Sequence, residues 1–419
     1  MLVAVHINLF FTPFPNLVMP LAKKRKFVKI VKARLPWISS LIDESNASEF
    51  NLPEVKLKYR STSLCLACKG RGWCGKAACP LLMRVKAYIK TISLVKSNLV
   101  VGSSPPSVFV GRIGYPYVRV APLVPPVNGD TSVYDTPELW LSKSIEEIVN
   151  FRLSLIRGNF LANVRKAGGD NKFLERTQLL AIARKSSEAE MLLKSRPKKA
   201  ILLDSHVQPI GPSSELRDLR VDEGLKVDQR IYRYYDALDV KAKDAILELY
   251  SRGVLISRIQ RAFSAGCFGV KLERKLVPTR WSITAVDSII SLHLIEKLKN
   301  YKPIDEFRVY HSEFLGNNWI VLMTPNYWSY EQMEAWYPKT TWNPFGKTFI
   351  ISDWEGFDGR SSYAITGGCY YSARLAITEK LVKEKKQATA IVFREILPKY
   401  LMPLGVWVTR EGVRKTLSQ

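Results

Sequence analysis

Residues 63–80 read Ser-Leu-Cys-Leu-Ala-Cys-Lys-Gly-Arg-Gly-Trp-Cys-Gly-Lys-Ala-Ala-Cys-Pro, and the cysteines among them decide how this part of the chain folds. Their spacing is C-x2-C-x5-C-x4-C, with glycines between them that let a short segment turn back on itself. Thiolates at this spacing can surround one ion tetrahedrally and leave no coordination position for water. We therefore expect the ion to stabilise the fold of the segment and not to take part in catalysis. The sequence therefore predicts a structural zinc site with the ligands Cys65, Cys68, Cys74 and Cys79.

Two alternatives remain open for these cysteines. Disulfides are disfavoured because a bridge between Cys65 and Cys68 would be strained, and because only Cys267 and Cys369 lie outside the segment, which is not the framework of a secreted protein. An iron–sulfur cluster is the second alternative, because ferredoxin-like cysteine runs also finish in Cys-Pro, although their internal spacings are tighter.

The charge of the chain indicates a polyanionic partner. Lys and Arg number 63 against 38 Asp and Glu, which gives a formal net charge of +25. An excess of this size attracts nucleic acid in a salt-dependent way, although basic residues on solvated faces are the simpler alternative. The charge is concentrated in a basic arm that follows an acid-free start, and we expect this arm to contact DNA. The arm consists of Lys23, Lys24, Arg25, Lys26, Lys29, Lys32 and Arg34.

Residues 1–21 are apolar, but their pattern is not that of a signal peptide or a membrane anchor. Prolines 13, 15 and 20 interrupt the run, and the positive charges follow it instead of preceding it. We therefore expect a cytoplasmic protein that does not insert into a membrane. Met19, just before the basic arm, is an alternative start of the chain.

Beyond the cysteines, the periodicity of apolar residues predicts an α+β fold with unevenly alternating elements. A turn-rich segment at 102–140 is expected to be ordered, and a break is expected near residue 300. Helices are expected at 80–95, 144–164, 173–193, 241–250, 254–263, 285–298 and 388–400. Strands are expected at 108–110, 117–120, 200–204, 307–311, 318–324 and 348–352.

Three patterns suggest chemistry, and each has a structural alternative. The helix pair around residue 252 resembles a helix-turn-helix in length, with Arg258 and Arg261 on its second helix. Aromatic residues crowd 327–357, among them Trp328, Trp336 and Trp342, and they either stack on bases or form core, the interpretation we favour slightly. Weak candidates for a Mg²⁺ nuclease site are Asp353, Glu355 and Asp358 at the end of this stretch, together with His311 and Glu313 on the preceding strand pair. The three acids at 353–358 also fit an Asp-rich turn.

Taken together, residues 65–80, 105–116, 135–140 and 278–287 resemble the archaeal DNA repair protein NreA family. The resemblance covers most of the chain from about residue 61. It implies a zinc finger, a role in DNA damage repair in an archaeal cytoplasm, and contact with the sliding clamp PCNA through a short C-terminal motif. Residues 405–419 depart from that motif. The implied organisation is a leader and arm at 1–60, the finger with its helix at 61–95, a large N-terminal family domain at 96–300 and a C-terminal one at 301–419.

The function that these patterns favour is DNA repair by a zinc-containing, DNA-binding protein. The competing class is an enzyme that acts on nucleic acid or nucleotides, either the nuclease above or an NAD-using transferase. In the transferase, Arg112 and Arg280 would hold phosphates in bidentate fashion. A pocket that contains both arginines favours the enzyme, whereas an open basic groove favours a binding module.

Overall fold

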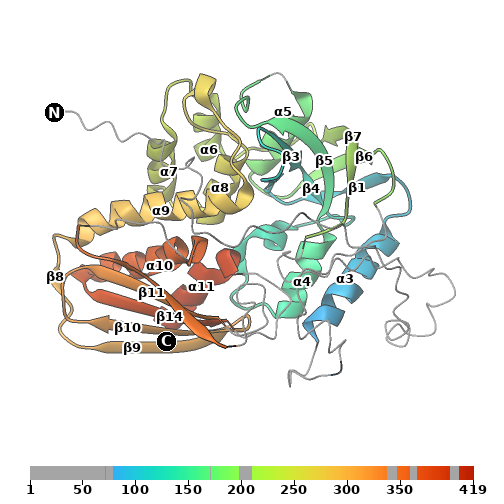
Figure 1. Ribbon diagram of the computed structural model, residues 1–419. Helices are drawn as coiled ribbons and strands as arrows, with labels where there is room; N and C mark the ends of the chain where they lie inside the picture. Colours follow the sequence, from blue (N-terminus) through green and yellow to red (C-terminus); the bar gives the residue numbers. More distant parts are fainter. Residues whose placement is uncertain are drawn as a thin grey trace, which may run out of the picture.

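The computed structural model describes residues 71, 79–169, 171–197, 210–336, 347–358, 366–396 and 405–419. Within these residues, helices and strands mix in an α+β fold, so the predicted fold class is confirmed (Figure 1). Several predicted features lie outside the described residues. They are Cys65, Cys68, Cys74, the basic arm, Trp342 and the strand at 200–204.

The first half of the described chain forms a seven-stranded sheet with the order β1-β6-β7-β5-β3-β2, in which β4 also pairs with β5. Its strands are β1 Leu99–Ser104, β2 Phe109–Val110, β3 Tyr117–Ala121, β4 Leu123–Val124, β5 Ile156–Asn163, β6 Ser187–Leu193 and β7 Ser213–Val221. Helices and 3-10 turns connect and cover it. They are α3 Pro80–Leu94, η3 Ser132–Asp135, η4 Pro137–Leu139, α4 Ile145–Ser154, α5 Lys172–Ala181, α6 Gln229–Asp236, α7 Ala242–Ser251, α8 Ile256–Ser264 and η5 Lys271–Glu273.

The second half forms a five-stranded sheet with the order β12-β11-β14-β10-β9. β11 and β14 run parallel, and the other neighbouring strands are antiparallel. The helices α9, α10 and α11 lie on one side of this sheet (Figure 1). The elements are α9 Thr279–Leu298, β8 Lys302–Pro303, β9 Arg308–Phe314, β10 Asn317–Thr324, β11 Ser329–Trp336, β12 Phe349–Glu355, α10 Gly368–Glu384, β13 Lys386–Gln387, β14 Thr389–Ile396 and α11 Gly405–Leu417.

The two sheets have separate apolar cores that meet at α9. One side of this helix places Ile283 and Leu298 in the core of the five-stranded sheet. Its other side places Val286 and Ile290 in the core of the seven-stranded sheet. A helix that is buried on two sides carries apolar residues all round instead of one stripe, which is the composition of α9. Among the described residues, no helix is both long and apolar enough to cross a membrane.

Three predicted helices were wrong in whole or in part, because strands replace them. The helix expected at 144–164 begins with the predicted capping box at Ser144 but ends at Ser154, and β5 follows. The helix expected at 173–193 ends at Ala181, and β6 follows, while the one expected at 388–400 is the strand β14. In β5 and β6 burial alternates residue by residue, so the period is two and not 3.6. The apolar residues fit both periods, and pairing with neighbouring strands decides between them.

The other elements expected within the described residues were found, but several of the observed elements were not anticipated. α3, α7, α8 and α9 occur where helices were expected, and β2, β3, β9, β10 and β12 occur where strands were expected. The missed elements are β1, β4, β7, α6, β8, β11, α10, β13 and α11. The sequence analysis missed α10 for a clear physical reason, because this helix buries Ser372, Arg374 and Thr378 as well as apolar residues. Polar residues on the buried side of a helix hide the apolar stripe by which a sequence reveals it.

The aromatic stretch divides into core and surface. Trp328 is 1% exposed and stacks on the buried ring of Tyr330 at a centroid distance of 6.2 Å, which supports the interpretation of these rings as core. Trp354, in contrast, is 61% exposed.

We predict that Trp328→Ala lowers the free energy of unfolding by about 3–5 kcal/mol, because it removes a large buried ring. Chemical denaturation followed by circular dichroism measures this change. Trp354→Ala is the matched control, and its effect should stay within about 0.5 kcal/mol because the ring is largely exposed. Equal effects of the two substitutions would show that Trp328 is not core.

Candidate nucleic-acid interface

The structure brings Arg112 and Arg280 together where β2 meets the start of α9. The backbone N–H of Val110, the last residue of β2, donates to Thr279 Oγ1 at 2.8 Å. The chain then continues into the loop that carries Arg112, while Arg280 follows Thr279 in the first turn of α9. The loop closes through a hydrogen bond from the N–H of Tyr117 to the carbonyl of Gly114 at 2.9 Å. The sequence prediction that these two arginines act together thus has a geometric basis.

The two guanidinium groups act on each other as like charges. Burial lowers the pKa of Arg280, and the positive charge of nearby Arg112 lowers it further, against an opposing effect of Cys369. Among the described residues, no ion pair joins either arginine to a carboxylate. A pair of cations without an acid between them attracts an anion, and guanidinium groups match the geometry of phosphate.

Two further features favour an anion at the same place. α9 is 20 residues long, and no side chain caps its N-terminus, where the helix dipole is positive. Exposed aromatic rings flank the arginines along the chain, because Tyr117 starts β3 and Trp281 follows Arg280. Such rings can stack on unpaired bases while the arginines hold the backbone.

The predicted metal site is only partly within the described residues. Cys79 is the residue that caps the start of α3, is half-buried and forms no disulfide, while the other three predicted ligands lie outside. Pro80 follows it as the first residue of α3, a position that proline favours. A thiol at a helix start that packs against the core fits the last ligand of a zinc finger joined to that helix.

The candidate nuclease residues are not gathered into one site. Asp353 and Glu355 lie on β12, one edge of the five-stranded sheet, whereas His311 and Glu313 lie on β9, the opposite edge. Strands about 4.8 Å apart place these edges roughly 19 Å from each other. Asp358 is exposed beyond the end of β12. Within the described ranges, no three His, Cys, Asp or Glu residues gather so that they could hold a metal ion.

Asp353 and Glu355 are instead buried and hydrogen-bonded. One carboxylate oxygen of Asp353 accepts from the backbone N–H and the hydroxyl of Thr366, each at 2.6 Å. Glu355 accepts from the hydroxyl of Tyr370 at 2.8 Å and pairs with Arg374 at 2.6 Å. Through these contacts, the two acids hold α10 and the segment before it against the sheet.

The helix-turn-helix interpretation was wrong. Arg261 is 1% exposed and donates to Asp135 at 2.7 Å, so it cannot reach DNA. Arg258 pairs with Asp228 at 3.3 Å and donates to the backbone carbonyls of residues 183 and 184. Most of α8 is buried, and a recognition helix must be exposed.

A network of buried charges was not found by sequence reasoning. Asp287 of α9 is fully buried and accepts from Gln260, Ser372 and Arg410 at 2.8, 2.6 and 2.8 Å. Arg410 also donates to Glu138 at 3.1 Å. Burial raises the pKa of Asp287, against the opposing effect of Arg410. The sequence offered one signal for this network, because residues 135–140 and 278–287 had already been singled out as motifs. Nothing in the sequence indicated which residues their acidic side chains contact.

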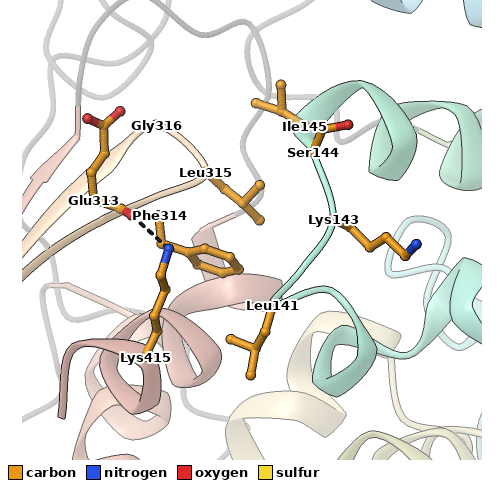
Figure 2. Close-up of a pocket in the computed structure, with 9 residues that line it drawn as sticks. All are labelled: Leu141, Lys143, Ser144, Ile145, Glu313, Phe314, Leu315, Gly316 and Lys415. Atoms are coloured by element: carbon orange, nitrogen blue, oxygen red, sulfur yellow. Dashed lines mark hydrogen bonds between the residues drawn. The ribbon is translucent and has the colours of Figure 1, made fainter. Parts of the chain in front are cut away.

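The structure also contains a surface hollow of about 290 Å³ between the start of α4, the turn from β9 to β10, and α11 (Figure 2). In Figure 2 the Glu313 carboxylate and the Lys143 amine lie on opposite sides of it. Lys143 pairs with Glu147 at 3.2 Å, and Lys415 donates to the backbone carbonyl of Glu313 at 3.3 Å. Because its polar groups do not converge, this hollow is a weaker candidate than the arginine pair.

Comparisons with known proteins agree with the resemblance. A family model described as archaeal Nre, N-terminal, matches residues 73–343, and one described as archaeal Nre, C-terminal, matches residues 355–419. The chain is 43% identical to DNA repair protein NreB of Archaeoglobus fulgidus over 84% of this chain and 87% of that protein. It is 38% identical to DNA repair protein NreA of the same organism over 84% and 88%, and 33% identical to DNA repair protein NreA of Haloferax volcanii over 76% and 78%. No solved structure matches.

We predict that Arg374→Ala destabilises the protein by about 3–5 kcal/mol, because it leaves the carboxylate of Glu355 buried without its cation. Glu355→Gln in the same chain should recover part of this loss, since it removes the unpaired charge. Denaturation of both variants measures the two effects, and Glu313→Gln on the exposed face is the control. If the Arg374→Ala variant were as stable as the parent, the ion pair between Arg374 and Glu355 would not stabilise the fold.

Proposed function

Because the chain belongs to the archaeal Nre family, we propose that it acts in archaeal DNA repair and that it binds nucleic acid at Arg112 and Arg280. The names of its relatives support the repair role. We place the binding site here because the two guanidinium groups are neighbours. Within the described residues, neither of them forms an ion pair with a carboxylate.

Phosphate is the ligand that this arrangement fits. Arginine binds phosphate oxygens through two parallel hydrogen bonds, and two adjacent arginines suit successive phosphates or the two phosphates of a nucleotide. The uncapped start of α9 adds a partial positive charge. The exposed rings of Tyr117 and Trp281 would accept bases, which favours a strand with unpaired bases.

The zinc finger and the basic arm belong to the same proposal. Zinc held by Cys65, Cys68, Cys74 and Cys79 would fix the finger to the start of α3, which packs into the core through Val85. The arm would add phosphate contacts and therefore salt-dependent affinity.

Contact with the sliding clamp PCNA is the part of the proposal with the least support. The family expectation places the clamp motif at the C-terminus, but α11 buries Val408, Val413 and Leu417 in the core. Side chains buried in this way are not available to a clamp, so any clamp contact would use another surface.

An NAD-using transferase is the second candidate. The same arginine pair matches the diphosphate of a nucleotide cofactor. A nuclease has less support, because its candidate acids lie at opposite edges of one sheet.

We predict that Arg112→Ala with Arg280→Ala weakens binding of single-stranded DNA by roughly tenfold at low salt, because charge-assisted hydrogen bonds to phosphate are lost. The slope of log affinity against log salt should also fall by about 0.7 for each single-strand contact removed. Fluorescence anisotropy at several salt concentrations measures both quantities.

The matched control is Arg217→Ala with Arg220→Ala on β7, which removes the same charge from exposed positions elsewhere on the seven-stranded sheet. It should leave affinity and slope close to those of the parent. Equal effects of the two double variants would mean that the arginine pair only adds to the overall charge. Loss of NAD binding with unchanged DNA binding would favour the transferase.

We predict about one zinc per chain, and its loss together with reduced stability in Cys68→Ser. Elemental analysis of the purified protein measures the metal, and thermal denaturation measures the stability. Cys267→Ser is the control, because that thiol is buried away from the segment and belongs to the other core. Iron with visible absorption would instead indicate a cluster, and a metal-free protein would contradict the site.

A further inference from the structure

The strands β3 and β5 carry side chains on the face of the seven-stranded sheet that points away from its core. The valines of β3 are fully buried, and side chains alternate along a strand, so Tyr117 and Arg119 point to this outer face. The antiparallel register sets Tyr117 opposite Asn163 and Arg119 opposite Leu161. We call these four side chains the outer patch.

The outer patch is open to solvent. Tyr117 is 56% exposed and Leu161 is 65% exposed, and Arg119 is exposed as well. The strand β7 pairs with β5 only as far as Glu215, opposite Asn159, and from there on it pairs with β6. A ligand therefore reaches the patch without displacing another described element.

The charge of this surface is positive and unpaired. Among the described residues, no carboxylate forms an ion pair with Arg119 or with Arg165, an exposed residue just beyond the end of β5. The positions of β3 and β5 on the outer face include no acid. Glu215, the first acid on the neighbouring strand β7, is paired with Lys194 at 3.1 Å. Such a surface attracts a polyanion.

A second cation lies next to Arg119. Arg157, on the same face of β5, is held by two hydrogen bonds to the carbonyl of Gly211, at 3.3 and 3.2 Å. Burial lowers the pKa of Arg157 to about 10, and the positive charge of Arg119 lowers it further, against an opposing effect of Tyr88. A phosphate bound beside Arg119 would therefore also relieve the repulsion between these two guanidinium groups.

The hairpin connects the outer patch to the arginine pair. The backbone N–H of Gly111 donates to the carbonyl of Arg119 at 2.8 Å, and Arg112 is the next residue of the chain. Paired and consecutive Cα atoms have known separations, so the backbones of Arg112 and Arg119 lie within roughly 10 Å of each other. A nucleic-acid strand held by phosphate at the arginine pair thus reaches Arg119 within its next few nucleotides.

We propose that a single strand of nucleic acid bound at Arg112 and Arg280 continues over the outer patch towards Arg165. This inference rests on the proposed function and names its substrate class, which is a strand several nucleotides long and not a dinucleotide cofactor. Arg119 and Arg165 would hold successive phosphates, and the exposed ring of Tyr117 would stack on a base. A duplex would keep its base faces away from this ring, so the patch suits unpaired bases.

Opposite charges introduced at Leu161 test the proposal, with fluorescence anisotropy of labelled oligo-dT as the measurement. Leu161→Glu should weaken binding of a strand of about 12 nucleotides by about fivefold, because a carboxylate would face the phosphates. Leu161→Lys should strengthen binding by a similar factor. Both substitutions remove the same leucine, so a loss of apolar contact alone would affect the two variants in the same direction.

The matched control is Leu99→Glu, which places the same charge at an exposed position of β1, at the opposite edge of the same sheet. Three strand spacings, or roughly 14 Å, separate β1 from β5, so salt screens the new charge and the affinity should stay within about twofold of the parent. Circular dichroism checks that all variants keep their fold, since the substituted positions are exposed.

The proposal fails if the two Leu161 variants change the affinity in the same direction, or if neither changes it. If Arg112→Ala with Arg280→Ala still weakens binding in that case, the proposed binding site stands without its extension over the patch. If that double variant has no effect either, the proposed site fails too. Equal responses of oligo-dT and a blunt duplex to the Leu161 variants would overturn the choice of a single strand.

Discussion

The buried carboxylate of Asp287 is the constraint on which the arrangement of the helices depends. A charge removed from water is tolerated only when partners satisfy it, and here the partners come from α8, α10 and α11. Arg410 extends the contact to Glu138 in η4, so the first and last thirds of the chain meet at one cluster. Apolar packing would allow these helices to slide, whereas hydrogen bonds to one carboxylate fix their relative positions.

The position of the arginine pair follows from this constraint. α9 carries Asp287 near its middle and Arg280 at its start, two turns apart along a rigid helix. The start of α9 is held in addition by the hydrogen bond between Val110 and Thr279. A binding residue on a helix that is fixed at two points keeps its geometry, and pre-organised groups lose less entropy when they bind.

Sequence reasoning succeeded where local signals agree with tertiary packing. The capping box at Ser144 marked the true start of α4. It failed at β5, β6 and β14, where the same apolar residues fit a helix or a strand and distant partners decide. It also failed at Arg261, because a sequence does not reveal that a basic residue faces a buried Asp135. Burial of charge is a tertiary property, so it becomes visible only when both partners are placed.

The core of the five-stranded sheet joins residues from both ends of the described chain. Val85 of α3 and Ile148 of α4 share it with Val413 and Leu417 of α11. During synthesis, α3 and α4 therefore emerge from the ribosome more than 250 residues before the side chains that complete their core. Contacts of such long sequence separation slow folding and leave apolar surface exposed in the meantime. The core around α3 and α4 is thus complete only once α11 packs against it.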